Sequence, residues 1–105
     1  MIIVTSRFHT APGTTDDGLK WAHKAFEYAQ KANWPGSLAT VLRPQSGTLR
    51  GFVWTGRFES LTEWQEWLSK AAADAKWQEI VKEMNKADWY LGVDRFLYGV
   101  IETSD

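Results

Sequence analysis

Aromatic side chains are the most constraining feature of this sequence. Seven Trp, five Phe and three Tyr residues occur among 105 positions. Each such side chain buries about 150–250 Å² when packed, and a chain of this length has room for a single core. The sequence therefore predicts one domain, residues 1–105, with a core built from rings. The remaining rings would form a subunit interface or the wall of a ligand cavity.

Charge and residue usage exclude several classes of function. The chain has 12 basic and 13 acidic residues, a formal net charge of −1, which disfavours a nucleic-acid partner. It has no cysteine, so disulfides and thiolate metal sites are excluded. Residues 1–6 lack the pattern of a secretion signal, and no apolar run is long enough to span a membrane. We therefore expect a cytoplasmic protein with no membrane partner.

Strand-like and helix-like segments alternate along the chain. Apolar residues repeat every second position in the strand-like segments and at helical spacing between them. Thr14 or Thr15 is expected to cap the first helix, Ser60 with Glu63 forms a capping box, and Asp74 caps a further helical segment. A hairpin loop is expected at residues 44–47. The expected strands are residues 2–10, 37–43, 49–58 and 93–101.

The order of these elements is β-α-β-β-α-β. It predicts an α+β, ferredoxin-like fold with a four-stranded antiparallel sheet and helices on one face. Both faces of that sheet read as apolar, and an uncovered apolar face is an association surface. We therefore expect a homodimer that forms an α/β barrel. In this interpretation Val93, Leu97 and Ile101 face the helices.

The candidate site follows from strand alternation. The residues assigned to the open face, as the lining of a cavity, are Ser6, Phe8, Phe52, Trp54, Phe58, Phe96 and Tyr98. Four charged or titratable residues occupy the alternate strand positions, whose side chains point to the opposite face of the sheet. They are secondary candidates: Arg7, His9, Arg57 and Arg95. A bulge that shifted the register would bring these cations into the cavity. The ligand is then expected to be a small aromatic molecule or, in the shifted register, a small anion.

Other chemistry has weaker support. His9 and His23 are the only side chains with an ordinary pKa near neutrality, and their spacing predicts no metal site. The segment Arg50–Trp54 resembles the start of an RNA-binding strand motif. Position eight of that motif is Arg57 where an aromatic residue is expected, so RNA binding is disfavoured.

Short motifs along most of the chain resemble the dimeric α/β-barrel superfamily. They are Phe8 through Pro12-Gly13, Phe58-Glu59-Ser60-Leu61, and Ala72-Ala73-Asp74 with Trp77. The resemblance is to NIPSNAP-like proteins and to antibiotic-biosynthesis-monooxygenase-like domains. It implies two subunits packed sheet to sheet, with a cavity inside the barrel or between each sheet and its helices.

The same resemblance implies a function. A cofactor-free, monooxygenase-like activity on an aromatic or polyketide-like molecule is the enzymatic hypothesis. Haem-degrading relatives need a histidine in the second half of the chain, and none follows His23, so no cofactor is expected. The alternative hypothesis is a non-catalytic structural or interaction homodimer, in which the aromatic residues only form the interface.

Overall fold

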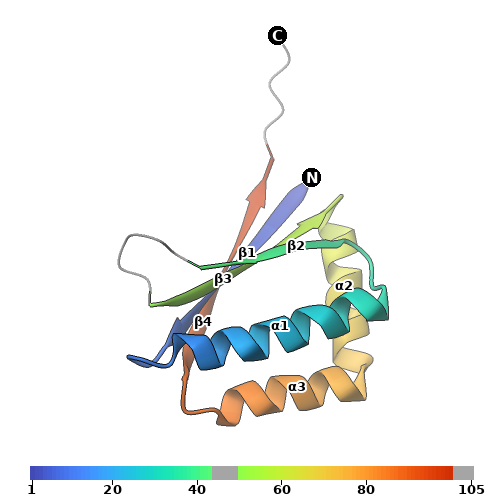
Figure 1. The fold of residues 1–105 in the computed structure, drawn as a ribbon. Helices are drawn as coiled ribbons and strands as arrows, with labels where there is room; N and C mark the ends of the chain where they lie inside the picture. The colour runs from blue at the N-terminus through green and yellow to red at the C-terminus, as the bar shows by residue number, and fades with distance from the viewer. Residues whose placement is uncertain (44–49, 101–105) are drawn as a thin grey trace.

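An antiparallel sheet carries a layer of helices on one face (Figure 1). The computed structural model describes residues 1–43 and 50–100, and within them the strand order is β2-β3-β1-β4. This is the α+β, ferredoxin-like arrangement expected from the sequence. The elements are β1 (Ile2–Thr10), α1 (Thr15–Ala32), β2 (Ser37–Leu42), β3 (Gly51–Phe58), α2 (Leu61–Ala73), α3 (Ala75–Lys86) and β4 (Tyr90–Gly99).

The predicted caps of the second and third helices are present. The Glu63 amide donates to Ser60 Oγ at 3.2 Å, and the Trp77 amide donates to Asp74 Oδ1 at 2.8 Å. The Glu63 carboxylate reaches back to the amide of Glu59, one residue before the cap, at 3.1 Å. These bonds satisfy amides that have no partner within their own helix. Asp74 therefore lies between α2 and α3 and caps the N-terminus of α3.

The first helix has a threonine at the predicted capping position, but the predicted capping hydrogen bond does not form. Thr14 occupies the capping position, but its side chain makes no capping hydrogen bond. Its hydroxyl donates to the Ala11 carbonyl at 2.7 Å instead. The Thr15 hydroxyl is bonded to that of Thr10 at 2.9 Å. The threonines thus stabilise the turn between β1 and α1 rather than the helix end.

Four strand boundaries differ from the expected ones. β2 ends at Leu42, one residue earlier than expected, and β3 begins at Gly51, two residues later. β4 begins at Tyr90, three residues earlier than expected, and ends at Gly99, two residues earlier. The early start of β4 follows a register shift that pairs Tyr90 with Thr10. The expected hairpin at 44–47 and the expected inward position of Ile101 lie outside the described residues.

Cross-strand pairing determines which residues share a face. Ser6 is opposite Trp54 on β3 and opposite Arg95 on β4, so these three side chains form one row. Their neighbours on the other face include Thr5, which is opposite Phe96. The expectation that Trp54 and Phe96 share a face is therefore wrong.

The core lies between the sheet and the helices. Phe8, Phe52 and Trp54 project from the sheet into this layer, where they meet Trp21 of α1 and Trp77 of α3. Phe58 is also buried there, against Trp64 of α2 at 5.0 Å between ring centroids. The prediction that these sheet aromatics line the open face is therefore wrong. The helices present rings of their own, and the largest apolar strand residues bury most area beneath them.

The uncovered face of the sheet has a different character. Phe96 and Tyr98 stack there with ring centroids 6.4 Å apart, and the Arg7 guanidinium lies 4.5 Å from the Phe96 ring centre. His9 Nε2 lies 2.7 Å from Asp94 Oδ2 on the same face. This face therefore carries exposed rings together with paired polar groups.

Acid should destabilise the protein in part through Asp74. Hydrogen bonds from the Trp77 amide and the Tyr28 hydroxyl lower the pKa of the Asp74 carboxyl below 3.8, its ordinary value. The unfolded chain then binds the proton more tightly than the folded chain. The stabilisation is complete above about pH 5 and is lost as the pH falls through the lowered pKa of the folded state.

Asp74→Asn tests this, because asparagine still caps a helix but does not titrate in this range. We expect its melting temperature to fall less steeply than that of the wild type between about pH 6 and about pH 3. Glu79→Gln, an exposed change on the same helix, should follow the wild type. If the melting temperatures of Asp74→Asn and the wild type fell equally with pH, the lowered pKa of Asp74 would not contribute to acid destabilisation, and this prediction would be wrong.

Candidate functional site

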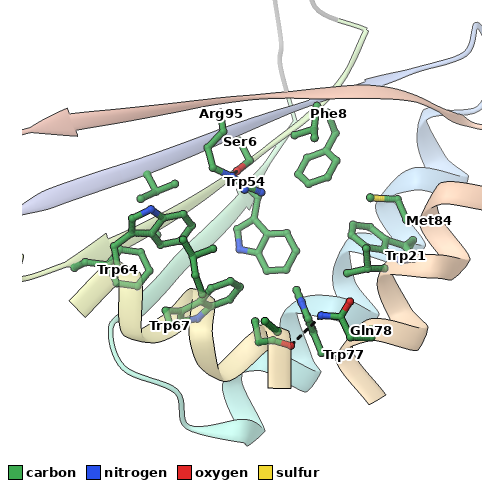
Figure 2. Close-up of a pocket in the computed structure, with 18 residues that line it drawn as sticks. Ser6, Phe8, Trp21, Trp54, Trp64, Trp67, Trp77, Gln78, Met84 and Arg95 are labelled. Atoms are coloured by element: carbon green, nitrogen blue, oxygen red, sulfur yellow. Dashed lines mark hydrogen bonds between the residues drawn. The ribbon is translucent and has the colours of Figure 1, made fainter. Parts of the chain in front are cut away.

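A pocket of about 340 Å³ lies between the sheet and the helices (Figure 2). Its size falls within the range of small-molecule sites. Strands β1, β3 and β4 form one wall, and α1, α2 and α3 contribute the rest. The described residues that line it include five tryptophans: Trp21, Trp54, Trp64, Trp67 and Trp77.

The tryptophan rings form a rigid wall. Trp64 and Trp67, three residues apart on α2, stack with ring centroids 5.6 Å apart and planes at 17°. Trp67 meets Trp77 of α3 nearly at right angles, at 5.8 Å. Trp54 meets Trp77 edge to face at 6.1 Å. Such a surface accommodates a flat ring either by stacking or by edge contact.

A row of polar groups crosses the sheet side of the pocket. Trp54, Ser6 and Arg95 are neighbours on three adjacent strands, and all three side chains line the pocket. Figure 2 places Ser6 and Arg95 together above the Trp54 ring. On the helix side, Gln78 Nε2 donates to the Ala71 carbonyl at 3.1 Å and links α3 to α2. The pocket is therefore apolar with a few placed polar groups.

Arg95 is held by two contacts. Its Nε donates to Ser6 Oγ at 3.0 Å, and its guanidinium carbon lies 5.7 Å from the centre of the Trp64 ring. No carboxylate in residues 1–43 or 50–100 forms an ion pair with it. Burial lowers the pKa of the Arg95 guanidinium from its ordinary value. Arg95 is nevertheless an exposed residue, and it has no protein counter-charge in the described part of the chain.

Trp54 has a polar atom without a partner. Its side chain is 8% exposed, and Nε1 is buried with no hydrogen-bond partner in the described structure. A buried donor left unsatisfied costs about 1–3 kcal/mol. Such groups are rare in folded proteins, and each one needs an explanation.

The structure brings together part of the predicted site. The predicted residues that line the pocket are Ser6, Phe8, Trp54, Phe58 and the secondary candidate Arg95. Ser6, Phe8, Trp54 and Phe58 lie under the helices rather than on the open face, and Arg95 lies on the helix side, where strand alternation had placed it.

Phe52 does not line the pocket. It stacks on Phe8 at 4.7 Å, is fully buried, and packs the core beside the pocket. The remaining predicted residues are on the open face of the sheet, away from the pocket: Arg7, His9, Arg57, Phe96 and Tyr98.

The helix residues of the site were not among the candidates. Helical spacing predicts that Trp64 lies on the apolar side of its helix and that Trp77 faces inward, and it assigns no role to Trp67. The spacing of three positions between Trp64 and Trp67 does place both rings on one side of α2. That signal indicates a common face, but it does not distinguish a filled core from a cavity wall.

Groups able to bind a metal or take up a proton lie elsewhere. The described ranges contain no cluster of three His, Cys, Asp or Glu side chains. Of the two histidines, His9 is paired with Asp94 on the open face and His23 is exposed on α1.

Phe52 and Trp54, which an RNA-binding strand would present on the open face, lie beneath the helices. In the described part of the chain, no helix is both long and apolar enough to cross a membrane.

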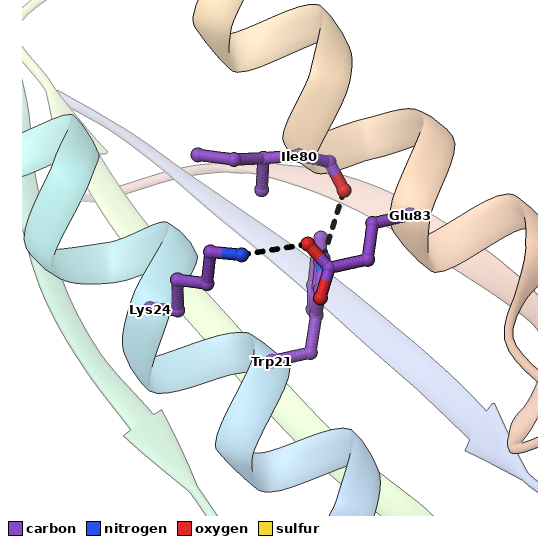
Figure 3. Close-up of polar contacts among 4 residues, drawn as sticks. All are labelled: Trp21, Lys24, Ile80 and Glu83. Atoms are coloured by element: carbon purple, nitrogen blue, oxygen red, sulfur yellow. Dashed lines mark hydrogen bonds and ion pairs between the residues drawn. The ribbon is translucent and has the colours of Figure 1, made fainter.

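Two bonds join α1 to α3 beside the pocket (Figure 3). Trp21 Nε1 donates to the Ile80 carbonyl at 2.9 Å in a buried position. Lys24 Nζ lies 2.7 Å from Glu83 Oε2 at the exposed surface. The buried bond fixes the orientation of the Trp21 ring, which lines the pocket.

Comparison with solved structures identifies the class of fold. A NIPSNAP domain protein from Burkholderia xenovorans matches with a TM-score of 0.83 and 14% identity, covering 100% of this chain and 99% of that one. A NIPSNAP family protein from Agrobacterium tumefaciens matches at 0.78 and 19%, covering 99% and 97%. A structure described as an antibiotic biosynthesis monooxygenase matches at 0.71 and 14%, covering 97% and 100%.

No family model and no curated protein matches the sequence. The protein thus has the fold of NIPSNAP proteins and antibiotic-biosynthesis-monooxygenase-like proteins. At this level the resemblance predicted from the sequence is confirmed.

The Trp21 bond should contribute more to stability than the surface ion pair beside it. Trp21→Phe keeps an aromatic ring but removes the donor and part of the buried area, and we expect it to lower the free energy of unfolding by about 1–3 kcal/mol. Lys24→Gln removes an exposed ion pair and should cost about 0–1 kcal/mol. Urea unfolding measures both, and equal losses would contradict the view that the buried bond holds α1 to α3.

Proposed function

We propose that this protein binds a small aromatic molecule in the pocket between its sheet and helices. The observation that carries the proposal is a cavity of about 340 Å³ with tryptophan rings on several sides. Ligand sites are typically concave and apolar, with few polar groups that set orientation. A pocket that served only as a packing defect would gain nothing from the polar row of Trp54, Ser6 and Arg95.

Oxygenation of the bound molecule is the enzymatic form of this proposal. One structure with the same fold is described as an antibiotic biosynthesis monooxygenase. Cofactor-free oxygenation would require loss of a proton from the substrate. The pocket lining in the described residues contains no His, Asp, Glu or Tyr to accept that proton. Binding is therefore better supported than catalysis.

Filling the pocket should abolish binding. Ala72 is an exposed residue of α2 that lines the pocket, and Ala72→Trp would place a large ring in it. Two soluble probes, 2-naphthamide and 2-naphthoate, present the same ring system with a neutral and an anionic group. We expect saturable binding of at least one probe to the wild type by isothermal titration calorimetry. Ala72→Trp should weaken it by about tenfold or more, because the ring would occupy the same volume.

Ala73→Trp is the matched control. Ala73 is the next residue of α2, is exposed and does not line the pocket, so this variant should bind as the wild type does. The circular dichroism spectra of both variants verify that the helices are retained. The proposal would be wrong if neither probe bound, or if Ala72→Trp bound as tightly as the wild type. The non-catalytic interaction protein would then be favoured.

The open face of the sheet supports a second proposal, a homodimer formed through that face. Phe96 and Tyr98 are 37% and 54% exposed and stack on each other, and the half-buried Ile3 and Val53 belong to the same face. Exposed rings among polar groups of this kind are typical of an association site. A second copy of the chain would cover it sheet to sheet, as the fold resemblance implies.

A charge on this face should weaken self-association. Phe96→Glu places a carboxylate among the exposed rings, where dimer formation would remove it from water at high cost. We expect sedimentation equilibrium to give a dimer for the wild type and a shift toward the 12.0 kDa monomer for Phe96→Glu. Gln30→Glu adds the same charge on the exposed side of α1 and should leave the dimer intact. A monomeric wild type at micromolar concentration would contradict the proposal.

A further inference from the structure

The polar groups on the sheet side of the pocket can all donate a hydrogen bond. Arg95 is a cation, Trp54 offers an indole N–H, and Ser6 offers a hydroxyl. No carboxylate in the described residues lines the pocket. The electrostatic character of this wall is therefore positive, and a ligand that complements it carries hydrogen-bond acceptors.

Arg95 has unused binding capacity. Its Nε is bonded to Ser6, while its terminal nitrogens have no hydrogen-bond partner in residues 1–43 and 50–100. The Trp64 ring lies beside the guanidinium and restricts its position. A guanidinium fixed at Nε and at one face presents its two terminal nitrogens as a planar fork, which matches the two oxygens of a carboxylate.

Trp54 gives an independent indication of a missing acceptor. Its side chain is more than nine-tenths buried and lies in the middle of the pocket (Figure 2). Its Nε1 has no partner in the described structure. Trp54 and Arg95 flank Ser6 on adjacent strands, and both line the pocket. Two donors without acceptors in one apolar site are consistent with a ligand that supplies the oxygens.

We propose that the ligand is an aromatic carboxylate, with its ring among the tryptophans and its carboxylate on the terminal nitrogens of Arg95. Ser6 is a positioning residue that holds the guanidinium toward the pocket, and Trp54 Nε1 donates to a ligand oxygen. This inference rests on the proposed function, since it identifies the class of molecule that the same pocket binds. A guanidinium that borders an apolar pocket attracts an anion more strongly than one surrounded by water does.

The preference between two probes of equal shape tests this inference. We expect the wild type to bind 2-naphthoate about tenfold or more tightly than 2-naphthamide, because only the carboxylate brings a negative charge and two equivalent oxygens to the Arg95 guanidinium. Arg95→Gln should reduce the affinity for 2-naphthoate to that for 2-naphthamide while changing the latter by less than about threefold. Titration calorimetry gives both affinities at the same pH and salt concentration.

Arg7→Gln is the matched charge control. Arg7 follows Ser6 on β1 but lies on the opposite face, over Phe96. This variant changes the net charge of the protein by the same amount as Arg95→Gln, and it should retain the preference for 2-naphthoate. Loss of the preference in both variants would mean that overall charge, and not the Arg95 fork, attracts the anion, and the inference would be wrong.

Variants of Ser6 and Trp54 should change the affinities for the two probes in different ways. Ser6→Ala should reduce the preference for 2-naphthoate, and Ser6→Thr, which keeps the hydroxyl, should restore it. Trp54→Phe keeps a ring but loses the N–H, so it should weaken both probes by a similar factor, since each carries an acceptor oxygen. A loss confined to 2-naphthoate would place the anion at Trp54 and contradict its assignment to Arg95. An unchanged affinity for both probes would refute the role of Trp54.

The two proposals fail in different ways. If both probes bind to the wild type with equal affinity and Ala72→Trp abolishes binding, the pocket binds aromatic molecules but the carboxylate assignment is wrong. If neither probe binds to the wild type, the proposed function itself is wrong, and the carboxylate assignment fails with it.

Discussion

Edge-to-face packing of Trp54 against the helix tryptophans is the interaction on which the rest of the structure depends. Trp54 projects from the central part of the sheet and meets Trp21 of α1 at 6.3 Å and Trp77 of α3 at 6.1 Å. Large rigid rings that meet at steep angles bury much area, but they do not fill space as interlocking aliphatic side chains do. The same contacts therefore hold the helices on the sheet and leave room for a pocket between them.

The polar row carries a cost that packing alone does not explain. An unsatisfied Trp54 N–H destabilises the folded state by about 1–3 kcal/mol. Arg95 is an exposed residue whose guanidinium loses some hydration, and Ser6 is its hydrogen-bonded partner in the described structure. Apolar side chains at these strand positions would pack the same layer without either cost. Polar groups that destabilise the folded protein are typical of binding sites, where a ligand supplies the missing hydrogen-bond partners.

Local signals in the sequence were sufficient for the element order and for two helix caps, because Ser60 and Asp74 act on amides three residues away. The face of the sheet was not predictable in the same way. Alternation divides the residues of one strand between the two faces of the sheet, but it does not say which residues of a neighbouring strand lie on the same face. That depends on the pairing between strands, such as the pairing of Thr5 with Phe96. The cavity wall was missed for a related reason, since Trp67 contributes through contacts between helices.

Strand alternation also separates the two proposed surfaces. Ser6 faces the pocket and the adjacent Arg7 faces the open side, so one strand serves both without sharing a side chain. In the register expected from the sequence, ring binding and subunit contact would compete for the same aromatic surface. In the observed register Trp54 is available to a ligand while Phe96 is available to a second copy of the chain. A dimer formed through the open face would therefore leave the helix-covered pocket of each subunit complete.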